Sequence, residues 1–468
     1  MKKRDQNAKN THHNKKSYYP DFDSEESEED SHTRSSESES DSESSSYEEA
    51  LMSSISKSKN TSPDKIALMR QIRPPIPVKT TTNANKPTER RIEFIRNVFD
   101  SGIKLKPMID FDNPEIGSEC ERLHKKTLDV KEILESQNLT LRYVKSGTTG
   151  HTFKATSSVN KNVAYAMKVC AYPKLDEYGH LRNPKRPENA ELRMLKLLSP
   201  FVQNMKTPHF VLPLYTFNTS ITPFIHVPPK LVDLSDEKNE AYRKFIERCE
   251  EGEFEDLVSV LISEWANGGD LLDYIRKNYK ELTLEKWTII FFQVLFTLAS
   301  LHRKFPSFRH NDMKVNNILV GLDNDKYSEA EYGYRMDNVK FNIPNIGIQI
   351  KIWDFDFSSI DGIIENNKVN SDWAKRKISI SKRRNQYYDM HFFFNTLICE
   401  KFFPQFYHGG VPPEIISFIH RMVPEPCRSV HANNYIRKGG RILFKKEITT
   451  PYKVIMEDKL FSKYRVVC

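Results

Sequence analysis

The order of the apolar patterns is the feature that most constrains the fold of this chain. Short runs typical of β-strands come first, at 139–146, 164–170, 211–217 and 257–264. Helical patterns occur at 188–198, then at 271–278 and, longest, at 287–301. Strands early and long helices late predict an α+β fold, with a small β-rich lobe followed by a larger helical lobe. Pro213 places its strand at a sheet edge, because proline lacks the N–H that a central strand needs.

Charge divides the chain into a tail and a body. The 468 residues carry a net charge of +8, but residues 21–50 alone carry −12, so the remainder carries +20. We expect residues 1–90 to be a disordered acidic, serine-rich tail and linker, because they cannot bury enough apolar surface to offset the entropy of ordering. The eleven serines within residues 21–50 fit a phosphorylated tail or a plain solubilising one.

The body begins with helical spacing just after residue 90, and its core patterns start at 139. Two later stretches, one charged and one rich in Asn and Tyr, do not fit compact elements, so we expect surface insertions, where long loops are tolerated. The expected units are a helical N-terminal extension at 91–138, a folded domain at 139–468 with lobes at 139–265 and 266–468, and insertions at 218–256 and 321–347.

Cysteine spacing and apolar runs argue against several protein classes. The six cysteines lie far apart, without a C-x-x-C pair or a His/Cys cluster, so neither a zinc site nor a disulfide framework is expected. The N-terminus lacks the apolar core of a secretory signal, and 287–301 is too short to span a bilayer, so we expect no secretion and no transmembrane segment. The basic body fits acidic substrates, an anionic membrane surface or a merely solvated surface, and we find no specific nucleic-acid motif.

Candidate chemistry follows the long helical run. Asp312 and Asn317 stand in one polar loop, and Asp354 ends an apolar strand pattern. Because Mg²⁺ prefers oxygen ligands and keeps part of its shell for water and phosphates, Asn317 and Asp354 are candidate metal ligands. Asp312 could accept the proton of an attacking hydroxyl. Lys314 could neutralise charge on a transferring phosphoryl group, which needs chiefly positioning and charge stabilisation.

The run from His310 to Asn317 resembles the catalytic loop of protein kinases, and the run from Asp354 to Asp356 resembles their Asp-Phe-Gly motif. Other kinase landmarks follow in the expected order over about residues 139–465. The resemblance implies a two-lobed protein-kinase-like fold that binds ATP and Mg²⁺, or Mn²⁺ in its place, between the lobes.

The same resemblance assigns residues around the phosphates. Gly147 and Gly150 belong to a glycine-rich loop that keeps two of its three usual glycines and lets backbone N–H groups approach phosphate oxygens. Lys168 stands where the ATP lysine is found. Glu191 stands where a helix glutamate pairs with that lysine, and Glu188 is the competing acid.

A second group of assignments lies at the hinge between the lobes and behind the catalytic loop. Backbone groups of Glu264 and Ala266 would meet the adenine edge, and Asp270 would reach the ribose. Asp389 resembles the buried aspartate that holds the catalytic-loop backbone. Residues 450–461 resemble the closing helix of kinase domains.

The resemblance implies an ATP-dependent serine/threonine protein kinase that phosphorylates protein hydroxyls. Kinases that act on serine and threonine usually have a lysine two residues after the catalytic aspartate, and Lys314 has that position relative to Asp312. One alternative is a small-molecule phosphotransferase of the choline-kinase type. Another is a pseudokinase scaffold, which predicts the loss of a metal ligand, the base or the ATP lysine, and none of these is lost.

A narrower resemblance rests on three runs, Asp354–Ser358, Asp361–Ile364 and Tyr387–Phe393. These runs are similar to the poxvirus-type serine/threonine kinases that act in virion assembly. Together with the Asn- and Lys-rich composition, they suggest a giant DNA virus as the source. The expected location is then the host cytoplasm or the virion.

Departures from the kinase pattern concern regulation and substrate choice. Asn311 replaces the arginine that usually grips a phosphorylated activation loop, so we expect no switch of that kind. Asp356 replaces glycine, and its Cβ should hinder the flip of Asp354 away from the metal. No Ala-Pro-Glu motif follows. The basic stretch 373–384 is expected near the substrate and predicts a preference for acidic peptides or anionic lipid surfaces.

Overall fold

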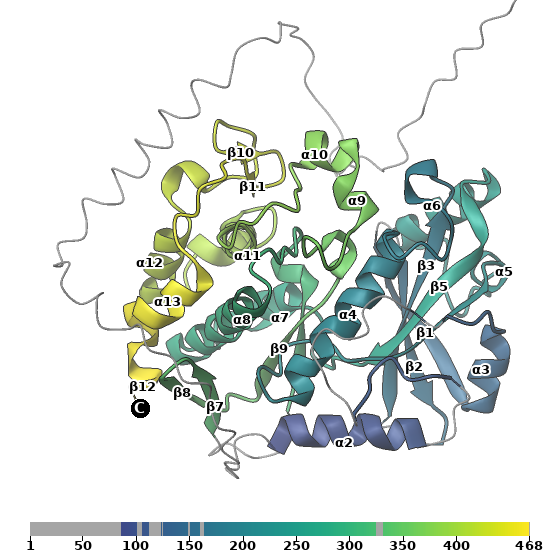
Figure 1. Cartoon of the computed structure of the whole chain (residues 1–468), viewed down its shortest axis with the longest axis horizontal. Helices are drawn as coiled ribbons and strands as arrows, with labels where there is room; N and C mark the ends of the chain where they lie inside the picture. Colours follow the sequence, from purple (N-terminus) through teal and green to yellow (C-terminus); the bar gives the residue numbers. More distant parts are fainter. Residues whose placement is uncertain are drawn as a thin grey trace, which may run out of the picture.

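The computed structural model describes residues 86–100, 105–111, 123, 125–147, 150–159, 163–323 and 331–467. The disorder predicted for residues 1–90 is wrong for residues 86–90, which are helical, and residues 1–85 lie outside the described residues. The N-terminal extension begins earlier than predicted, because helix α2 runs from Lys86 to Asp100. In Figure 1, α2 lies along one side of the molecule, below the sheet of the first lobe.

The first lobe is built on a five-stranded antiparallel sheet in the order β1-β2-β3-β5-β4. All four predicted strands are present, and Pro213 lies in an edge strand, as predicted. Helix α4 (Pro187–Gln203) packs against this sheet (Figure 1). The strands are β1 (Leu139–Ser146), β2 (Gly150–Ser157), β3 (Ala164–Pro173), β4 (Pro213–Ser220) and β5 (Phe254–Glu264).

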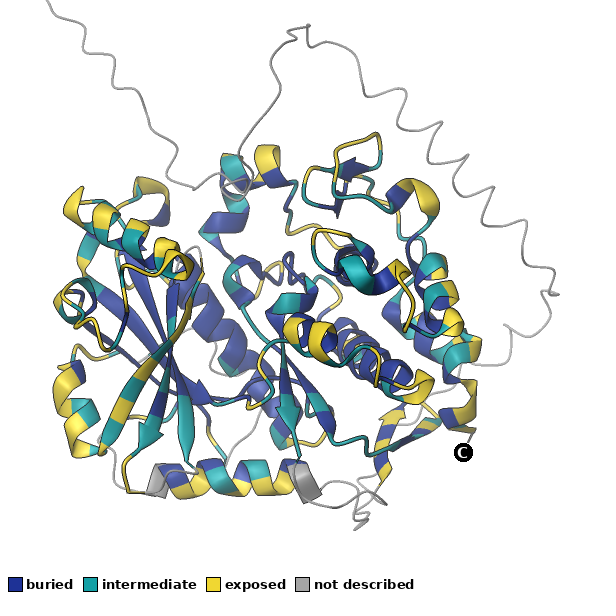
Figure 2. Ribbon diagram, turned by 180° about the vertical axis from the view of Figure 1, so that it is seen from behind, coloured by how far each residue is buried: buried dark blue, intermediate teal, exposed yellow. Residues whose placement is uncertain are grey.

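The second lobe packs around helix α8 (Leu284–Lys304), whose residues are mostly buried (Figure 2). By length and composition alone, α8 could cross a membrane, but 78% of its most apolar window is buried inside the protein, as in the core helix of a soluble domain. The antiparallel sheet of the first lobe and the helices of the second confirm the α+β class. The other helices of this lobe are α7 (Leu271–Asn278), α9 (Asn367–Asn370), α10 (Asp372–Ile378), α11 (Tyr388–Ile398), α12 (Pro413–Met422) and α13 (Pro451–Glu457).

The first insertion, 218–256, is not the loop that was predicted. It contains helix α5 (Thr222–Ile225) and helix α6 (Glu240–Glu250). Tyr242 and Phe245 of α6 are buried, and their rings lie 4.5 and 4.2 Å from the ring of His151 on β2. Their spacing of three residues places them on one helix face, a pattern that the many charged neighbours conceal.

The second insertion, 321–347, also folds. Strands β7 (Glu331–Met336) and β8 (Val339–Pro344) form a hairpin, and β12 (Arg465–Val467) adds a third strand beside β8. The rings of Tyr334 and Phe341 lie 5.2 and 5.1 Å from that of Phe292 on α8. Every second residue of β7 is buried, which is the period of a strand with one face on the core.

A short two-stranded ladder positions the loops that carry the polar residues. Strand β6 (Ile318–Leu322) pairs antiparallel with β9 (Ile348–Ile352), and Ile318 lies opposite Ile352. The residues just before β6 and just after β9 therefore leave the ladder at the same end. The Trp353 N–H donates to the Asn317 carbonyl at 3.3 Å, which keeps the two loops together.

Candidate active site

The loop between α8 and β6 is held from behind by one buried carboxylate. Asp389 of α11 accepts the N–H of His310 and the N–H of Asn311, each at 2.8 Å. Asn311 has a positive φ of 64° and is buried, and its Nδ2 donates to the Phe357 carbonyl at 2.9 Å. Asp389 thus holds the loop backbone, as predicted. The side chain of Asn311 ties this loop to the segment after Asp354, a contact that the sequence did not reveal.

Asp312 is buried in this loop and has a partner on each carboxylate oxygen. Its Oδ2 accepts the Asn317 Nδ2 at 2.8 Å and lies 3.4 Å from the Lys314 Nζ. Its Oδ1 pairs with the guanidinium of Arg441. Burial alone would raise the pKa of Asp312, but the positive charges of Lys314 and Arg441 outweigh it and hold the pKa below its usual value. Asp312 is therefore a carboxylate at neutral pH, as a proton acceptor must be.

Lys168 of β3 connects the first lobe to this loop region. Its Nζ lies 2.7 Å from the Glu191 Oε1 on α4 and 3.0 Å from the Asp354 Oδ1 after β9. The structure therefore brings Glu191 to the lysine, whereas Glu188 pairs with Arg186 at 3.2 Å. Burial opposes the charge on Lys168, but Asp354 and Glu191 together raise its pKa well above the usual value. Lys168 is therefore a permanent cation between two acids.

Asp354 occupies an unusual backbone conformation. It has a positive φ of 63°, in the left-handed region that residues other than glycine rarely adopt. About a third of its side chain is exposed, the highest fraction among the Lys168 partners. Burial works against its charge, but Lys168 and Lys314 lower the pKa of Asp354. Strained backbone of this kind is characteristic of functional sites.

Asp356, two residues after Asp354, replaces the glycine of the kinase motif, and it has an ion-pair partner in the structure. Its carboxylate pairs with Lys368 of α9, and both side chains are nearly buried, at 13% and 2% exposure. The Asn366 Nδ2 donates to its carbonyl at 2.8 Å. The segment after Asp354 is therefore fixed by a buried ion pair that the sequence did not predict.

Gly150 and Gly147 lie on either side of the glycine-rich turn, whose residues Thr148 and Thr149 fall outside the described residues. The N–H of Gly147 donates to the carbonyl of Gly150 at 2.8 Å. A Cβ on Gly150 would lie 2.7 Å from the Cys170 Sγ and 3.1 Å from the Val169 carbonyl. Position 150 therefore has no room for a side chain, which is the property expected of a backbone that approaches a ligand or another strand.

Residues of the predicted hinge make further contacts that the sequence did not reveal. The Glu264 N–H donates to the Leu212 carbonyl at 3.1 Å. Its buried carboxylate pairs with Arg91 of α2 and with Lys351 of β9, whose Nζ lies 2.7 Å away. Ala266 is buried. Asp270 caps helix α7 by accepting the Asp273 N–H at 2.9 Å, and it pairs with Lys145 of β1 at 3.3 Å.

Two arginines in these networks were not found from the sequence. Arg91 lies 173 residues from Glu264 along the chain, and Arg441 lies 129 residues from Asp312. Neither stands in a recognisable motif. Only the glycines at 439 and 440, both with positive φ, mark the approach of the chain to Arg441.

Comparison with known proteins places this site in context. The family model for poxvirus serine/threonine protein kinases matches residues 275–422. A protein of Acanthamoeba polyphaga mimivirus, named as a candidate serine/threonine-protein kinase (R400), is 56% identical over 422 residues, which cover 90% of this chain and 86% of the relative. A second candidate kinase of that virus, R301, is 31% identical over 186 residues, covering 36% of this chain and 46% of the relative. A kinase of Dictyostelium discoideum is 34% identical over 102 residues, 21% of this chain and 8% of the relative.

Proposed function

Because the chain belongs to the serine/threonine protein kinases of the poxvirus type, we propose that its site between the lobes transfers the γ-phosphate of ATP at Asp312. The observation that carries this proposal is the position of Lys168. It joins Glu191 of the first lobe to Asp354 of the second at 2.7 and 3.0 Å, so both lobes contribute to one charged site. Asp312 and Asn317 stand at the same end of the β6–β9 ladder as Asp354.

Asn317 and Asp354 fit a magnesium ion by the chemistry of their oxygen atoms. Asn317 directs its Nδ2 to Asp312, so its Oδ1 is the atom left to bind a cation. The described residues contain no group of three or more His, Cys, Asp or Glu side chains that could hold a metal. Two oxygen ligands completed by phosphate and water suit Mg²⁺, with Mn²⁺ as the alternative. When bound, such an ion supplies charge neutralisation at the phosphate oxygens.

The remaining residues position the two substrates. Asp312 accepts the proton of the serine or threonine hydroxyl, and Lys314 stabilises charge on the transferring group. Lys168, held by Glu191, binds phosphate oxygens of ATP, as does the backbone of Gly147 and Gly150. Backbone groups of Glu264 and Ala266 bind the adenine edge, and Asp270 binds the ribose.

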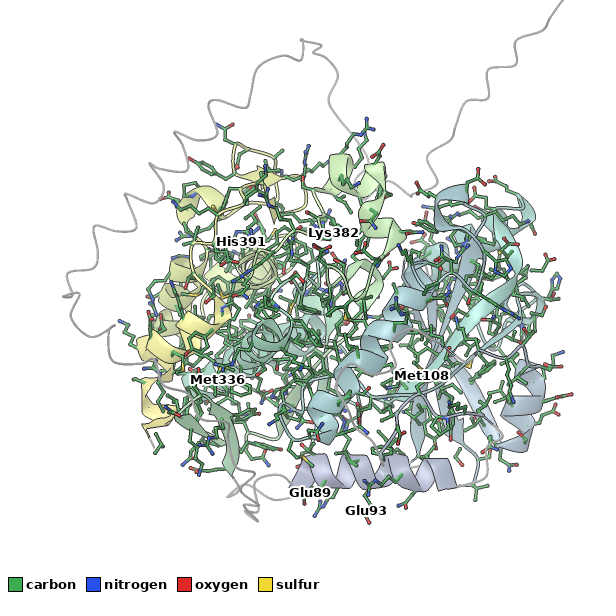
Figure 3. The ribbon with its side chains drawn as sticks, viewed as in Figure 1. Glu89, Glu93, Met108, Met336, Lys382 and His391 are labelled. Carbon is green, nitrogen blue, oxygen red and sulfur yellow. The ribbon has the colours of Figure 1, made fainter. Side chains whose placement is uncertain are left out.

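Acidic protein segments are the substrates that the surface beside this site favours. Lys375, Lys377 and Arg383 are exposed in and after α10, and Lys382 of the same stretch is labelled in Figure 3. Some of this charge is already neutralised, since Lys382 pairs with Asp361 at 3.0 Å. A peptide array with and without acidic flanks tests the preference. Equal rates on both sets, or binding of anionic vesicles alone, would contradict it.

We propose the virion or the host cytoplasm as the location, as for a kinase of virion assembly.

The central proposal is tested with Asp312→Asn in an ATP/Mg²⁺ assay on a mixed protein extract. Asparagine keeps the shape of the side chain but cannot accept the proton, so we expect a rate loss of about 10² to 10⁴-fold. The melting temperature should fall while the variant stays folded, because the buried Arg441 loses its charged partner but keeps its bond to the Asn311 carbonyl. Asp256→Asn, at an exposed position of β5, is the matched control and should phosphorylate normally. Transfer to protein at the wild-type rate by Asp312→Asn would refute the assignment.

A further inference from the structure

Arg441 is a buried cation at the catalytic carboxylate that the proposed mechanism does not use. It lies in β11 (Arg441–Ile442), which pairs with β10 (Ile436–Arg437) late in the second lobe. Only 1% of the residue is exposed. Its Nη2 pairs with the Asp312 Oδ1, and its Nε donates to the Asn311 carbonyl at 3.4 Å. A charged residue that is almost wholly buried needs a specific reason to be there.

The surrounding residues fix Arg441 in this position. Its guanidinium lies 4.6 Å above the ring of Phe392 on α11. Asn395, one turn further along α11, donates through Nδ2 to the carbonyl of Gly440 at 3.1 Å and to that of Ser429 at 2.8 Å. Helix α11 also carries Asp389, which holds the catalytic-loop backbone. One helix therefore anchors both the loop and the arginine that reaches it.

We propose that Arg441 is a positioning residue that holds the carboxylate of Asp312 in its working orientation. The inference rests on the proposed function, since it concerns the same proton acceptor. With Oδ1 held by Arg441 and Oδ2 by the Asn317 Nδ2, the carboxylate cannot rotate about its last bond without breaking a contact. A carboxylate oxygen can accept two hydrogen bonds, so these contacts still allow Asp312 to accept the substrate hydroxyl.

The neighbouring residue of the loop, Asn311, does not supply this contact. This position carries no positive charge, and its side chain is bonded to the Phe357 carbonyl. The catalytic loop therefore takes its arginine from a distant part of the same chain. The contact is internal and buried, so it holds Asp312 whether or not another segment is phosphorylated. Lys314 is different, since 20% of its side chain is exposed to solvent.

An opposite role, in which Arg441 blocks the site, fits the burial less well. A side chain that fills the place of a substrate is exposed to solvent when no substrate is bound. Arg441 instead reaches Asp312 from the interior, across Phe392. The two roles predict opposite changes in rate when the arginine is removed.

The test compares Arg441→Met and Arg441→Lys with the wild type in the full-length chain. We expect Arg441→Met to lower kcat by about 10²-fold, the loss typical of a misplaced reacting group, with the KM for ATP unchanged. The acid limb of the kcat profile should move to higher pH, because an opposite charge beside the carboxylate is lost. Arg441→Lys should keep most of the pH profile and recover part of the rate.

Arg428→Met is the matched control. Arg428 lies in the same C-terminal part of the second lobe and donates to the carbonyls of Val423 and His420 at 2.7 and 2.9 Å, but it does not touch the catalytic loop. It should lose stability without a shift in the pH profile. A higher kcat in Arg441→Met would overturn the proposal in favour of blocking. A kcat and a pH profile equal to those of Arg428→Met would overturn it in favour of a merely structural role.

A crystal structure of the Arg441→Met variant separates this inference from the proposed function. The Asp312 carboxylate should turn away from its present orientation, and the 2.8 Å contact between its Oδ2 and the Asn317 Nδ2 should lengthen or break, whether or not the chain phosphorylates a given substrate. An unchanged orientation of Asp312 would refute the inference while leaving the kinase assignment intact. A wild-type chain inactive on every protein substrate would refute the proposed function while the structure of the variant still decides the role of Arg441.

Discussion

Replacement of Arg91 by methionine should release α2 from the back of the hinge. Arg91 donates to the Pro208 carbonyl at 2.6 Å, to the Phe210 carbonyl and to both oxygens of Glu264. The outer face of α2 carries Glu89 and Glu93, which point away from the protein (Figure 3), so Arg91 is the charged anchor of the inner face.

The magnitude follows from what remains after the change. Removal of one partner from a buried ion pair costs about 3 to 5 kcal/mol when the other charge is left alone. Glu264 would keep Lys351, whose Nζ lies 2.7 Å from its Oε2. We therefore expect a loss of about 2 to 3 kcal/mol in the free energy of unfolding, below the range for an isolated buried charge. The pKa of Lys351, which burial and Arg91 lower to about 8, should rise toward its usual value.

Urea unfolding of the full chain gives the free energy, and hydrogen exchange of residues 86–100 reports directly on α2. Arg96→Met is the matched control, because Arg96 is an exposed arginine of the same helix and, among the described residues, contacts the ring of Phe111 at 5.0 Å. That contact is worth about 0.5 to 1 kcal/mol. The reasoning is wrong if both variants unfold at the same urea concentration and the amides of α2 exchange at wild-type rates in Arg91→Met.

Two further predictions concern the catalytic loop and the pH dependence of stability. Asp389→Asn should lower the free energy of unfolding by about 1 to 3 kcal/mol and should lower kcat, because the new amide NH₂ would face a backbone N–H that the Asp389 carboxylate accepts in the wild type. Leu397→Met, a buried change in the same helix, is the control and should keep kcat. An unchanged kcat in Asp389→Asn would exclude the anchoring role. Lys125 has its Nζ among three neutral oxygens, and burial lowers its pKa to about 7 from 10.5. The unfolded chain therefore binds more protons than the folded chain between about pH 7 and 10. In that range the free energy of unfolding of the wild type, relative to that of Lys125→Met, should rise by up to about 1.4 kcal/mol per pH unit. Urea unfolding that shows no change of this difference with pH would contradict the lowered pKa.

Most of the fold could be predicted because its signals are local. The apolar run 287–301 lies inside α8, and Thr283 caps that helix by accepting the Lys286 N–H at 3.3 Å. The strand at 139–146 matches β1 from its first residue to its last. Helix α6 and the β7–β8 hairpin were missed for a different reason. Their apolar residues alternate with charges, so average polarity suggested loops although the periodicity was present.

The candidate site was predicted to the extent that it lies in short motifs. Asp312, Lys314 and Asn317 fall within six residues, and the β6–β9 ladder brings Asp354 to them. Arg441 and Arg91 reach the site only through tertiary packing, and no local pattern marks either residue. A single arginine in a basic chain is usually a solvated surface residue, so no feature of the sequence distinguished these two.

The buried pair between Asp356 and Lys368 has a consequence for inhibitor chemistry. One class of inhibitor would bind only after Asp354 and Phe355 move outward and open a deeper apolar space. In this chain that movement would separate a nearly buried ion pair, at a cost of about 3 to 5 kcal/mol. Such compounds would lose about two to three and a half orders of magnitude in affinity, since each 1.4 kcal/mol is a factor of ten. Compounds that bind with Asp354 in its present place would meet no such penalty and are the better starting point for selective inhibition.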